Sequence, residues 1–219
     1  MDFDYHILIR SIPILLNGLG WTLLIAMTSI LGGSGLGLGL CAFNLSNIKS
    51  ARWLSRTYIE FFRTTPEMVL IFWVYFCFPP LFDVRLSAFW SGTLALTLVT
   101  GAYLAEIFRA GIQSIGAGQG DAAKALGLKW HHRWALVILP QALRRMIPAI
   151  MAYLTELLKN TALLSAIGVT ELAYRASTLG AETFRYMEFL SAVGVIFFGI
   201  IYPVSLAARI LEGRLLRRT

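Results

Sequence analysis

Polar side chains interrupt two long apolar runs of this 219-residue chain, and they are the residues best suited to act on a passing solute. The first group is Arg63, Thr65 and Glu67, and the second is Lys159, Asn160 and Thr161. Charged side chains inside a membrane are costly, and they usually face a bundle interior or a water-filled pathway. Both groups are therefore candidate contacts for a substrate that crosses a membrane.

Each group also has a plainer interpretation. Arg63 and Glu67 are four residues apart, a spacing that allows an internal ion pair on one helix face. Lys159 follows Glu156 by three residues and can be neutralised in the same way. In the functional interpretation, Arg63 contacts a substrate carboxylate and Lys159 contacts an anion at a break in its span, where transporters commonly bind substrate. The sequence leaves both interpretations open.

Residue patterns of known catalytic sites are missing from the chain. There is no Gly-x4-Gly-Lys-Ser/Thr loop for ATP, no His-Glu-x-x-His zinc motif and no Ser/His/Asp set. His131 and His132 are adjacent without further ligands in spacing, which favours a polar surface over a metal site. Cys41 and Cys77 both lie in apolar runs. The sequence thus predicts a protein that is not an enzyme and binds no metal or cofactor of its own.

A short polar segment rich in small residues stands out among the apolar runs. It comprises Asp121, Ala122, Ala123, Lys124, Ala125, Leu126 and Gly127, with Pro140 thirteen residues after the glycine. Small side chains let another protein approach a helix closely. The segment is therefore a candidate docking surface, and an ordinary amphipathic connector is the plainer alternative.

Composition indicates a membrane protein. Hydrophobic residues make up 57% of the chain and charged residues only 14%, whereas soluble domains carry about a quarter charged residues. The net charge of +7 comes from basic residues scattered between apolar runs, without a basic stripe. Loop topology explains this charge better than nucleic-acid binding does.

Apolar runs of about 20 residues are long enough to cross a bilayer. We expect one all-α membrane domain over residues 1–219, with a polar loop at about 110–140 and a short N-terminal helix on the membrane surface at 1–17. Five spans are expected, at Leu19–Phe43, Tyr58–Phe78, Ala88–Phe108, Met146–Val169 and Phe189–Ala208. In the first span, Gly33/Gly37 and Gly35/Gly39 predict close helix packing. In the second, Pro66 predicts a kink.

Lysine and arginine counts predict the orientation. The segments 44–57 and 109–145 and the C-terminal tail hold three, six and four of these residues, whereas the opposite side holds only Arg10, Arg85, Arg175 and Arg185. Basic loops stay in the cytoplasm. We therefore expect the N-terminus outside, the C-terminus in the cytoplasm, and the 121–127 segment on the cytoplasmic side.

The spacing of the small-residue segment resembles that of a known protein family. Membrane subunits (permeases) of binding-protein-dependent ABC importers carry Glu-Ala-Ala, three residues, Gly, nine residues and Ile-x-Leu-Pro. Asp121 and Val137 stand in the Glu and Ile places, and the matching residues are Ala122, Ala123, Gly127, Leu139 and Pro140. The resemblance implies that this loop is a coupling helix that docks in a cleft of a cytoplasmic ATPase.

Further segments extend the resemblance over nearly the whole chain. Phe62–Pro66, Glu106–Gly111, Ile138–Arg144 and Lys159–Leu163 look like the polar amino-acid branch of these permeases. Arg109–Ile115 and Arg175–Gly180 look most like glutamate/aspartate permeases. The chain departs from the branch at Glu67–Leu70, where two apolar residues and Val-Gln are usual, and at Asn160 to Ala162. These departures suggest the less specialised half of a heterodimer.

The resemblance implies a type I ABC importer permease of a bacterial cytoplasmic (inner) membrane. A second permease copy or homologue, two ATPase subunits that bind ATP and Mg²⁺, and an extracytoplasmic substrate-binding protein would be its partners. The alternative is an amino-acid channel or secondary transporter that works without ATP. Five spans without a visible internal repeat argue against an inverted-repeat carrier.

Overall fold

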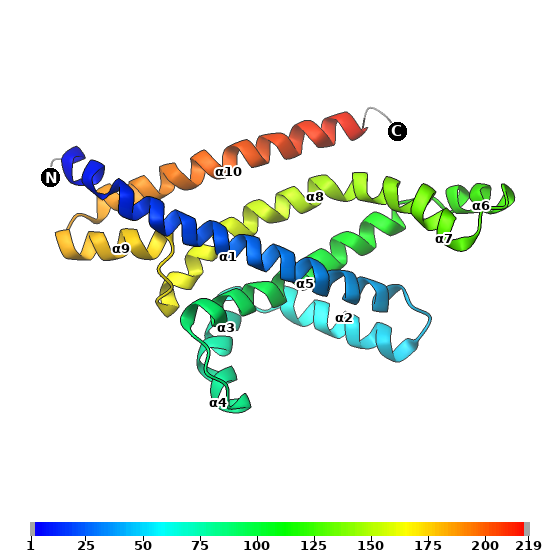
Figure 1. Cartoon of the computed structure of the whole chain (residues 1–219), viewed down its shortest axis with the longest axis horizontal. Coiled ribbons are helices and arrows are strands. Elements are labelled where there is room, and N and C mark those ends of the chain that lie inside the picture. The colour runs from blue at the N-terminus through cyan, green and yellow to red at the C-terminus, as the bar shows by residue number, and fades with distance from the viewer. Residues whose placement is uncertain (1–2, 217–219) are drawn as a thin grey trace.

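The described part of the chain, residues 3–216 of this computed structural model, is entirely helical (Figure 1). In chain order the elements are α1 (Tyr5–Leu45), α2 (Lys49–Thr64), α3 (Glu67–Phe72), the π-helical η1 (Trp73–Cys77), α4 (Phe78–Phe82), α5 (Ala88–Gln113), α6 (Ala117–Ala125), α7 (Trp130–His132), the π-helical η2 (Arg133–Ile138), α8 (Leu139–Asn160), the 3-10 helix η3 (Thr161–Ile167), α9 (Leu172–Thr183) and α10 (Tyr186–Leu216). Four helical stretches can cross a membrane, and a bent pair makes five. The expected all-α, five-span class is therefore confirmed. Residues 1, 2 and 217–219, with part of the predicted basic tail, lie outside the described residues.

The N-terminal segment is helical as expected, but it is not a separate surface helix. Residues 5–17 continue without a break into the first span, because α1 is a single helix of 41 residues. At 1.5 Å per residue such a helix is ~60 Å long, about twice the bilayer core. Gly18, between the expected surface helix and the expected first span, lets α9 approach: a Cβ there would lie 2.9 Å from the Arg175 side chain. The end of α1 therefore projects beyond the membrane core.

Glycines bring α1 and α5 into close contact. A Cβ at Gly33 would lie 2.4 Å from Thr100 Cγ2, and one at Gly37 would lie 3.0 Å from the Ala105 backbone nitrogen. The predicted packing role is therefore confirmed for this pair. A Cβ at Gly35 or Gly39 would meet no atom within 4 Å, so the second pair packs against nothing in the described chain.

Hydrogen bonds between helices add to this packing. The Ser55 hydroxyl of α2 donates to the Leu40 carbonyl of α1 at 2.7 Å. The Tyr58 hydroxyl, also in α2, donates to the Leu98 carbonyl of α5 at 3.0 Å. Away from water, such bonds satisfy polar groups that lipid cannot satisfy. They hold α2 along the α1–α5 pair.

The second span breaks where a kink was expected. Pro66 has no backbone N–H, and it forces the preceding Thr65 out of the helical region, to φ −78° and ψ 132°. The two helices on either side, Lys49–Thr64 and Glu67–Phe82, are consequently bent by 106°. The segment from α3 to α4 leaves the bundle sideways (Figure 1).

The fourth span begins earlier than its hydropathy suggested. One helical stretch runs from Trp130 to Ile167, so it starts inside the polar loop expected at about 110–140. The next polar segment holds α9, whose first turn is capped by the buried Glu171 carboxylate. Helix α10 then begins at Tyr186, slightly before the predicted fifth span.

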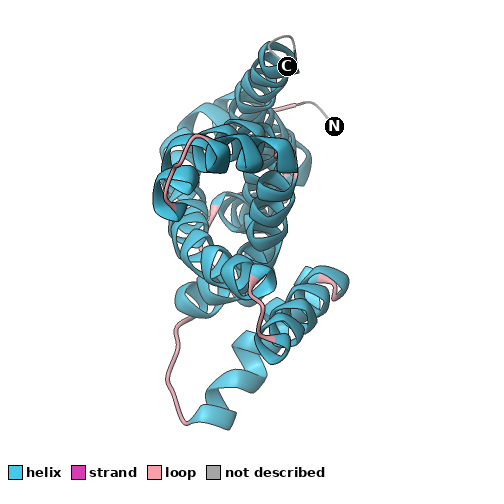
Figure 2. Ribbon diagram, turned by 90° about the vertical axis from the view of Figure 1, so that its right-hand side faces the viewer, coloured by secondary structure: helices cyan, strands magenta, loops and turns pink. Residues whose placement is uncertain are grey.

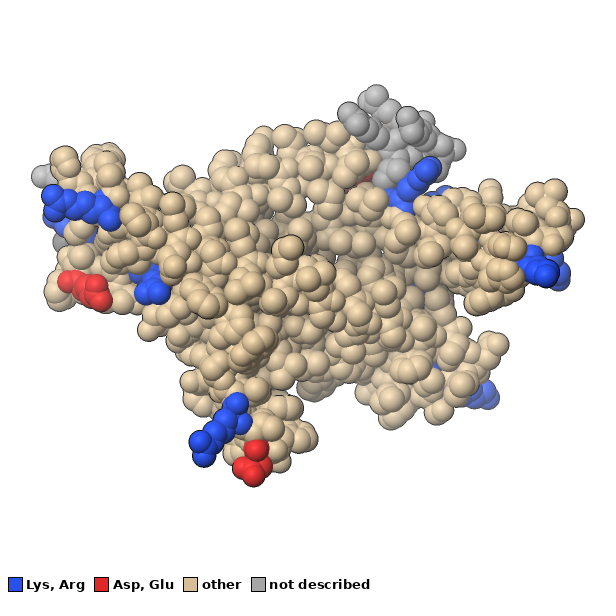
Figure 3. Space-filling view, viewed as in Figure 1, with Lys and Arg blue, Asp and Glu red and all other residues tan. Residues whose placement is uncertain are grey.

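Charged residues gather at the two ends of the molecule. Figure 3 shows lysine and arginine at both ends and beside the α4 arm, while the broad middle of this face carries no charge. The α1–α2 connection, α6 and the C-terminal end of α10 lie towards one end, and α9 lies at the other (Figure 1). Viewed from the α6 end, the long helices are seen nearly end-on (Figure 2). The uncharged middle is the part that fits a bilayer.

Candidate functional site

The small-residue segment predicted for docking forms most of α6. This helix begins after Gly116 and ends at Ala125, and it lies at the tip of the molecule (Figure 1). Asp121, Ala122, Lys124 and Ala125 are exposed, whereas Ala123 is buried against the rest of the chain. The helix therefore offers one face of small and charged residues to a neighbour.

Gly127 closes α6 in a conformation that suits glycine. Its φ of +75° lies in the left-handed region, which side chains with a Cβ rarely adopt. Past this turn, the Leu128 N–H donates to the Ala123 carbonyl at 3.1 Å and satisfies a carbonyl of the last helical turn. Space around Gly127 is open, so backbone conformation rather than crowding favours a glycine here.

The loop that carries α6 is braced against both neighbouring helices. At the end of α5, the Ser114 carbonyl accepts a hydrogen bond from the Arg145 guanidinium of α8 at 2.5 Å. The Gln141 amide of α8 donates to the Gln119 side chain of α6 at 3.5 Å. Pro140 lies where the π-helical η2 passes directly into α8, so its missing N–H removes one backbone donor inside a continuous helical stretch. A force on α6 would therefore reach α5 and α8.

Apolar side chains are exposed beside α6. Leu126 is 82% exposed and Trp130 is 67% exposed, and Leu136 of η2 is also open. Exposed apolar side chains near one another are candidate contacts for another protein or for a membrane. Leu126 lies outside the candidate spans, so this end of the loop is suited to a protein partner.

The substrate-path candidates of the second span lie on two different helices. Arg63 lies in the last turn of α2 and Glu67 begins α3, and the 106° bend between the helices separates them. Among the described residues, no ion pair joins them. The ion pair suggested by their spacing is therefore wrong, because that spacing places two side chains together only on a continuous helix. Thr65 lies in the break itself and is partly buried.

Two tyrosines that the sequence did not single out lie beside these charges. The Arg63 guanidinium carbon is 5.5 Å from the ring centre of Tyr103 in α5. Tyr103 stacks on Tyr153 of α8, with ring centres 5.0 Å apart and planes 24° apart. The Tyr153 hydroxyl donates to Thr100 at 3.0 Å. The sequence signal that could have identified these two residues is a tyrosine within an otherwise apolar span, because buried tyrosines need a polar partner.

The second group of candidates lies where α8 ends, and its members differ in environment. The predicted break is present, since the α-helix changes to 3-10 at Thr161. Lys159 is half-exposed and pairs with Glu156 at 2.8 Å, so the plainer interpretation of this charge is confirmed. Asn160 is partly buried. Thr161 is fully buried and its hydroxyl bonds the Leu158 carbonyl at 2.8 Å, so it is not open to a solute.

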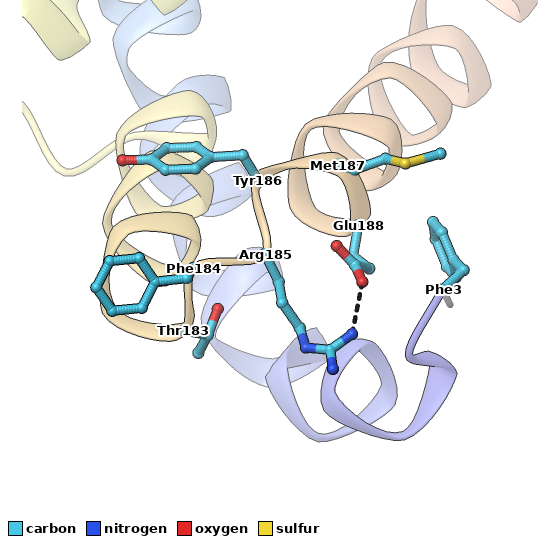
Figure 4. Close-up of a pocket in the computed structure, with 7 residues that line it drawn as sticks. All are labelled: Phe3, Thr183, Phe184, Arg185, Tyr186, Met187 and Glu188. Atoms are coloured by element: carbon cyan, nitrogen blue, oxygen red, sulfur yellow. Dashed lines mark hydrogen bonds and ion pairs between the residues drawn. The ribbon is translucent and has the colours of Figure 1, made fainter. Parts of the chain in front are cut away.

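The end of the molecule opposite α6 holds a cavity of about 430 Å³ (Figure 4). Arg185 reaches Glu188 at 3.0 Å and Asp4 at 3.8 Å, and this contact joins the N-terminus of α1 to α10. The N–H of Ile7, with that of His6, lowers the pKa of the Asp4 carboxyl, so Asp4 caps α1 as an anion. Phe184 is 88% exposed at this end. The cavity thus lies at a helix junction rather than at the middle of the spans.

Within residues 3–216, no group of three or more His, Cys, Asp or Glu side chains could hold a metal ion. The adjacent His131 and His132 are exposed, in keeping with a polar surface. Cys41 is buried and Cys77 is exposed, and both are free thiols. The groups suited to act on a solute or a partner are therefore the polar side chains of the spans and the surface of α6.

Comparison with known proteins agrees with this arrangement. Residues 33–217 match the family described as the inner membrane component of binding-protein-dependent transport systems. The arginine transport system permease of Bacillus subtilis (strain 168) is 34% identical over 98% of both chains. The glutamate/aspartate import permease of Escherichia coli O157:H7 is 34% identical over 100% of this chain and 99% of its own. The glutamine transport system permease of Escherichia coli (strain K12) is 35% identical over 98% of this chain and 99% of its own.

Solved structures agree with the fold. A chain of an amino acid ABC transporter crystallised with histidines superposes with a TM-score of 0.89 at 31% identity and covers 98% of this chain and 100% of its own. A chain of an inward-facing methionine ABC transporter superposes with a TM-score of 0.78 at 20% identity and covers 93% of this chain and 97% of its own. This likeness supports the fold alone. From the family match, the full-length relatives and this superposition, it follows that the chain belongs to the inner membrane components of binding-protein-dependent transport systems, as an amino-acid ABC transporter permease.

Proposed function

We propose that this permease moves polar amino acids into the cell, and that α6 is the coupling helix through which ATPase subunits drive it. The observation that carries the proposal is the construction of α6. It is a short helix at the tip of the molecule, closed by a left-handed glycine, exposed on one face and braced to α5 and α8. A rigid exposed helix of this kind can transmit the movement of a docked partner to the spans.

The proposed assembly contains two permeases, two ATPase subunits and an extracytoplasmic substrate-binding protein. ATP and Mg²⁺ would bind in the ATPase subunits, because this sequence contains no Gly-x4-Gly-Lys-Ser/Thr loop. A second permease, either a copy or a homologue, would cover the α3–α4 arm. Trp73, Phe76 and Phe82 are exposed on that arm.

The proposed orientation places α6 in the cytoplasm of a bacterial cell and the α9 end outside. Its support is the positive-inside rule applied to segments that gather at one end of the molecule. The N-terminus would then face outwards and the C-terminus inwards. In this orientation an ATPase reaches α6 and a binding protein reaches the cavity beside Phe184.

The amino acid that is transported is the finer part of the proposal. Glutamate and aspartate are favoured by the sequences at 109–115 and 175–180, but those segments lie in the last turns of α5 and in α9. Neither contributes a side chain to the Arg63, Tyr103 and Tyr153 group. Relatives are named for arginine, for glutamate/aspartate and for glutamine. Uptake of these labelled amino acids into proteoliposomes that contain the whole importer identifies the substrate.

Substitution of Gly127 tests the coupling role. Gly127→Val places a β-branched residue at φ +75°, where its Cβ is strained. We expect ATP-driven uptake to fall at least about tenfold, which corresponds to a loss of ~1.4 kcal/mol, while the protein still inserts in the membrane and ATP is still hydrolysed. Gly127→Asn is the matched control, since asparagine tolerates this conformation and should retain most uptake. Normal uptake by the valine variant would refute the coupling role.

The alternative is an amino-acid channel or secondary transporter that works without ATP. Affinity purification of the tagged chain from its native membrane separates the two functions. An ATP-binding subunit should be recovered with the chain in the importer, and its amount should fall when Leu126 is changed to Asp. Recovery of the chain alone, with uptake that ATP depletion does not affect, would favour the alternative.

A further inference from the structure

The start of α2 carries a surface of cations that have no acidic partner. Lys49 and Arg56 are exposed, and Arg52 between them is partly exposed. Within residues 3–216, neither Lys49 nor Arg56 forms an ion pair or a side-chain hydrogen bond, and the exposed Glu60 one turn further on is not paired with Arg56. The sequence contains no Asp or Glu from residue 5 to residue 59. We call Lys49, Arg52 and Arg56 the α2 basic surface.

Helical spacing places these three cations on one side of α2. They follow one another by three and four residues, a spacing that brings side chains together on a helix. Another side of α2 is buried, where Ser55 and Ile59 pack against the rest of the chain. Arg52 is fixed in place, because its guanidinium donates to the Ser46 carbonyl from Nη2 at 2.7 Å and from Nε at 3.3 Å. The surface is therefore held by the fold.

Hydrogen bonds show that α2 runs back along α1, from the charged end of the molecule towards its middle. Arg52 bonds Ser46 at the end of α1, and Ser55 bonds Leu40, six residues earlier in the chain. Figure 1 shows the two helices side by side at this end. The seven residues that the α2 basic surface spans rise ~10 Å along the helix. One headgroup layer of a bilayer is roughly 5–8 Å thick, so the surface extends over the depth of that layer.

Exposed apolar side chains lie next to the α2 basic surface. Trp53 is 69% exposed beside the cations. Leu54 and Phe61, which are seven residues apart and so lie on one side of the helix, are 61% and 54% exposed. Tryptophan is enriched where a protein passes from water into lipid, and Lys and Arg are enriched on the cytoplasmic side. The combination suits a helix that enters a bilayer beside its headgroups.

Anionic phospholipid is the occupant that fits both parts of this region. Its phosphate has the charge that complements a surface without acidic residues, and its acyl chains suit the exposed apolar side. The bilayer is also adjacent already, because α2 and the helices after the break make the bent second span. The proposed docking helix for the ATPase, α6, is a separate element. A lipid therefore reaches this region without any further partner.

We propose that the α2 basic surface binds the headgroups of anionic phospholipids in the cytoplasmic leaflet, with Lys49 and Arg56 as the charge contacts. Arg52 links this contact to the end of α1. The inference goes beyond amino-acid import and takes from the proposed function only the orientation of the chain. Lipid bound here would tie the α1–α2 connection to the membrane surface while α6 moves with its partner.

Lipid titration of the purified whole importer, followed by native mass spectrometry, tests this inference. The probes are phosphatidylglycerol and phosphatidylcholine with identical acyl chains, so that only the headgroup differs. In low salt we expect the unsubstituted importer to bind phosphatidylglycerol at least about tenfold more tightly, because each basic residue near an anionic surface contributes a gain on the order of fivefold. High salt should reduce this preference, since exposed charges are screened.

Charge substitutions locate the lipid contact. Lys49→Gln combined with Arg56→Gln should reduce the preference to less than about threefold. Lys49→Arg combined with Arg56→Lys keeps both charges and should retain the preference. The matched control is Arg10→Gln with Arg85→Gln, which removes two exposed cations elsewhere in the chain and should bind both lipids like the unsubstituted importer. Equal melting temperatures without added lipid show that the three variants are folded.

Equal binding of the two lipids by the unsubstituted importer, an unchanged preference in the glutamine variant of Lys49 and Arg56, or the same loss in the control variant would overturn the inference. Loss of another subunit from the glutamine variant, with its lipid preference unchanged, would assign the surface to a protein partner instead. Uptake of amino acids is a separate measurement. If uptake fails while the lipid preference is found, the proposed function fails alone.

Discussion

At the scale of single residues, polar side chains fasten the helices of this permease to one another. Glu171 is fully buried between α1 and α9. Its carboxylate accepts hydrogen bonds from the Tyr174 N–H at 2.7 Å, the Ala173 N–H at 2.9 Å and the Thr22 hydroxyl at 3.4 Å. The Thr22 hydroxyl also accepts from the Leu172 N–H at 3.2 Å. One carboxylate thus caps α9 and joins it to the first span.

Removal of this carboxylate should destabilise the protein. Glu171→Ala leaves the first N–H groups of α9 and the Thr22 hydroxyl without an acceptor, which we expect to cost about 2 kcal/mol. Thermal unfolding in detergent measures the loss as a lower melting temperature. Glu182→Ala, exposed on the same helix, is the control and should unfold like the original protein. Equal melting temperatures for the two variants would contradict this role of Glu171.

At the scale of elements, the contact between α1 and α5 depends on which face of α1 each glycine occupies. Gly33 and Gly37 meet α5 so closely that a methyl group would collide with it. Gly35 and Gly39 lie on open surface, free for lipid or a second subunit. Glycines two residues apart in one helix therefore have different functions, and spacing alone did not distinguish them.

Alanine substitutions at these two positions should have opposite effects. Gly33→Ala forces Thr100 or the α5 backbone to move, with an expected cost of ~1–3 kcal/mol. Gly35→Ala adds a methyl group in open space and should leave stability unchanged or raise it by up to ~1 kcal/mol, since alanine favours helix. Unfolding by denaturant in mixed micelles compares the two. If Gly33→Ala is as stable as Gly35→Ala, the described contact does not form.

At the scale of the whole molecule, the outer surface determines how the chain lies in a bilayer, because the face seen in Figure 3 has charged ends and a middle without charge. The α6 tip and the Phe184 turn belong to opposite ends (Figures 1 and 4). Coupling to a cytoplasmic ATPase requires the first of these inside the cell. The orientation is therefore the global property on which the proposed mechanism depends.

Thiol labelling in intact cells tests this orientation. In a variant with Cys41 and Cys77 replaced by alanine, a membrane-impermeant thiol reagent should label Phe184→Cys directly. The same reagent should label Leu126→Cys only after the membrane is permeabilised, because both side chains are exposed and the proposed orientation puts them on opposite sides of the membrane. Labelling of Leu126→Cys in intact cells would place α6 outside and exclude its proposed partner.

Local properties of the sequence were sufficient for the number of spans, the helix terminators and the candidate coupling helix, but not for the residues at which the first and fourth spans begin. Hydropathy indicates which runs avoid water, while Gly127 and Pro66 restrict the backbone through a left-handed φ and a missing N–H. The family resemblance located Asp121–Gly127 and Pro140 on the same basis, since a short motif needs only neighbours in the chain. These properties depend on only a few neighbouring residues, so they can be predicted from the sequence without knowledge of the tertiary structure.

Tertiary structure decided everything that depends on residues far apart in sequence. The 106° bend sends Arg63 towards Tyr103 instead of Glu67, and the packing of α5 on α8 brings Tyr103 to Tyr153. Burial removes Thr161 from any solute path. The close approach of α9 to α1 at Gly18 likewise joins residues far apart in sequence. Such outcomes arise from contacts between helices. The periodicity of a sequence does not specify which helices become neighbours or at what angle they cross.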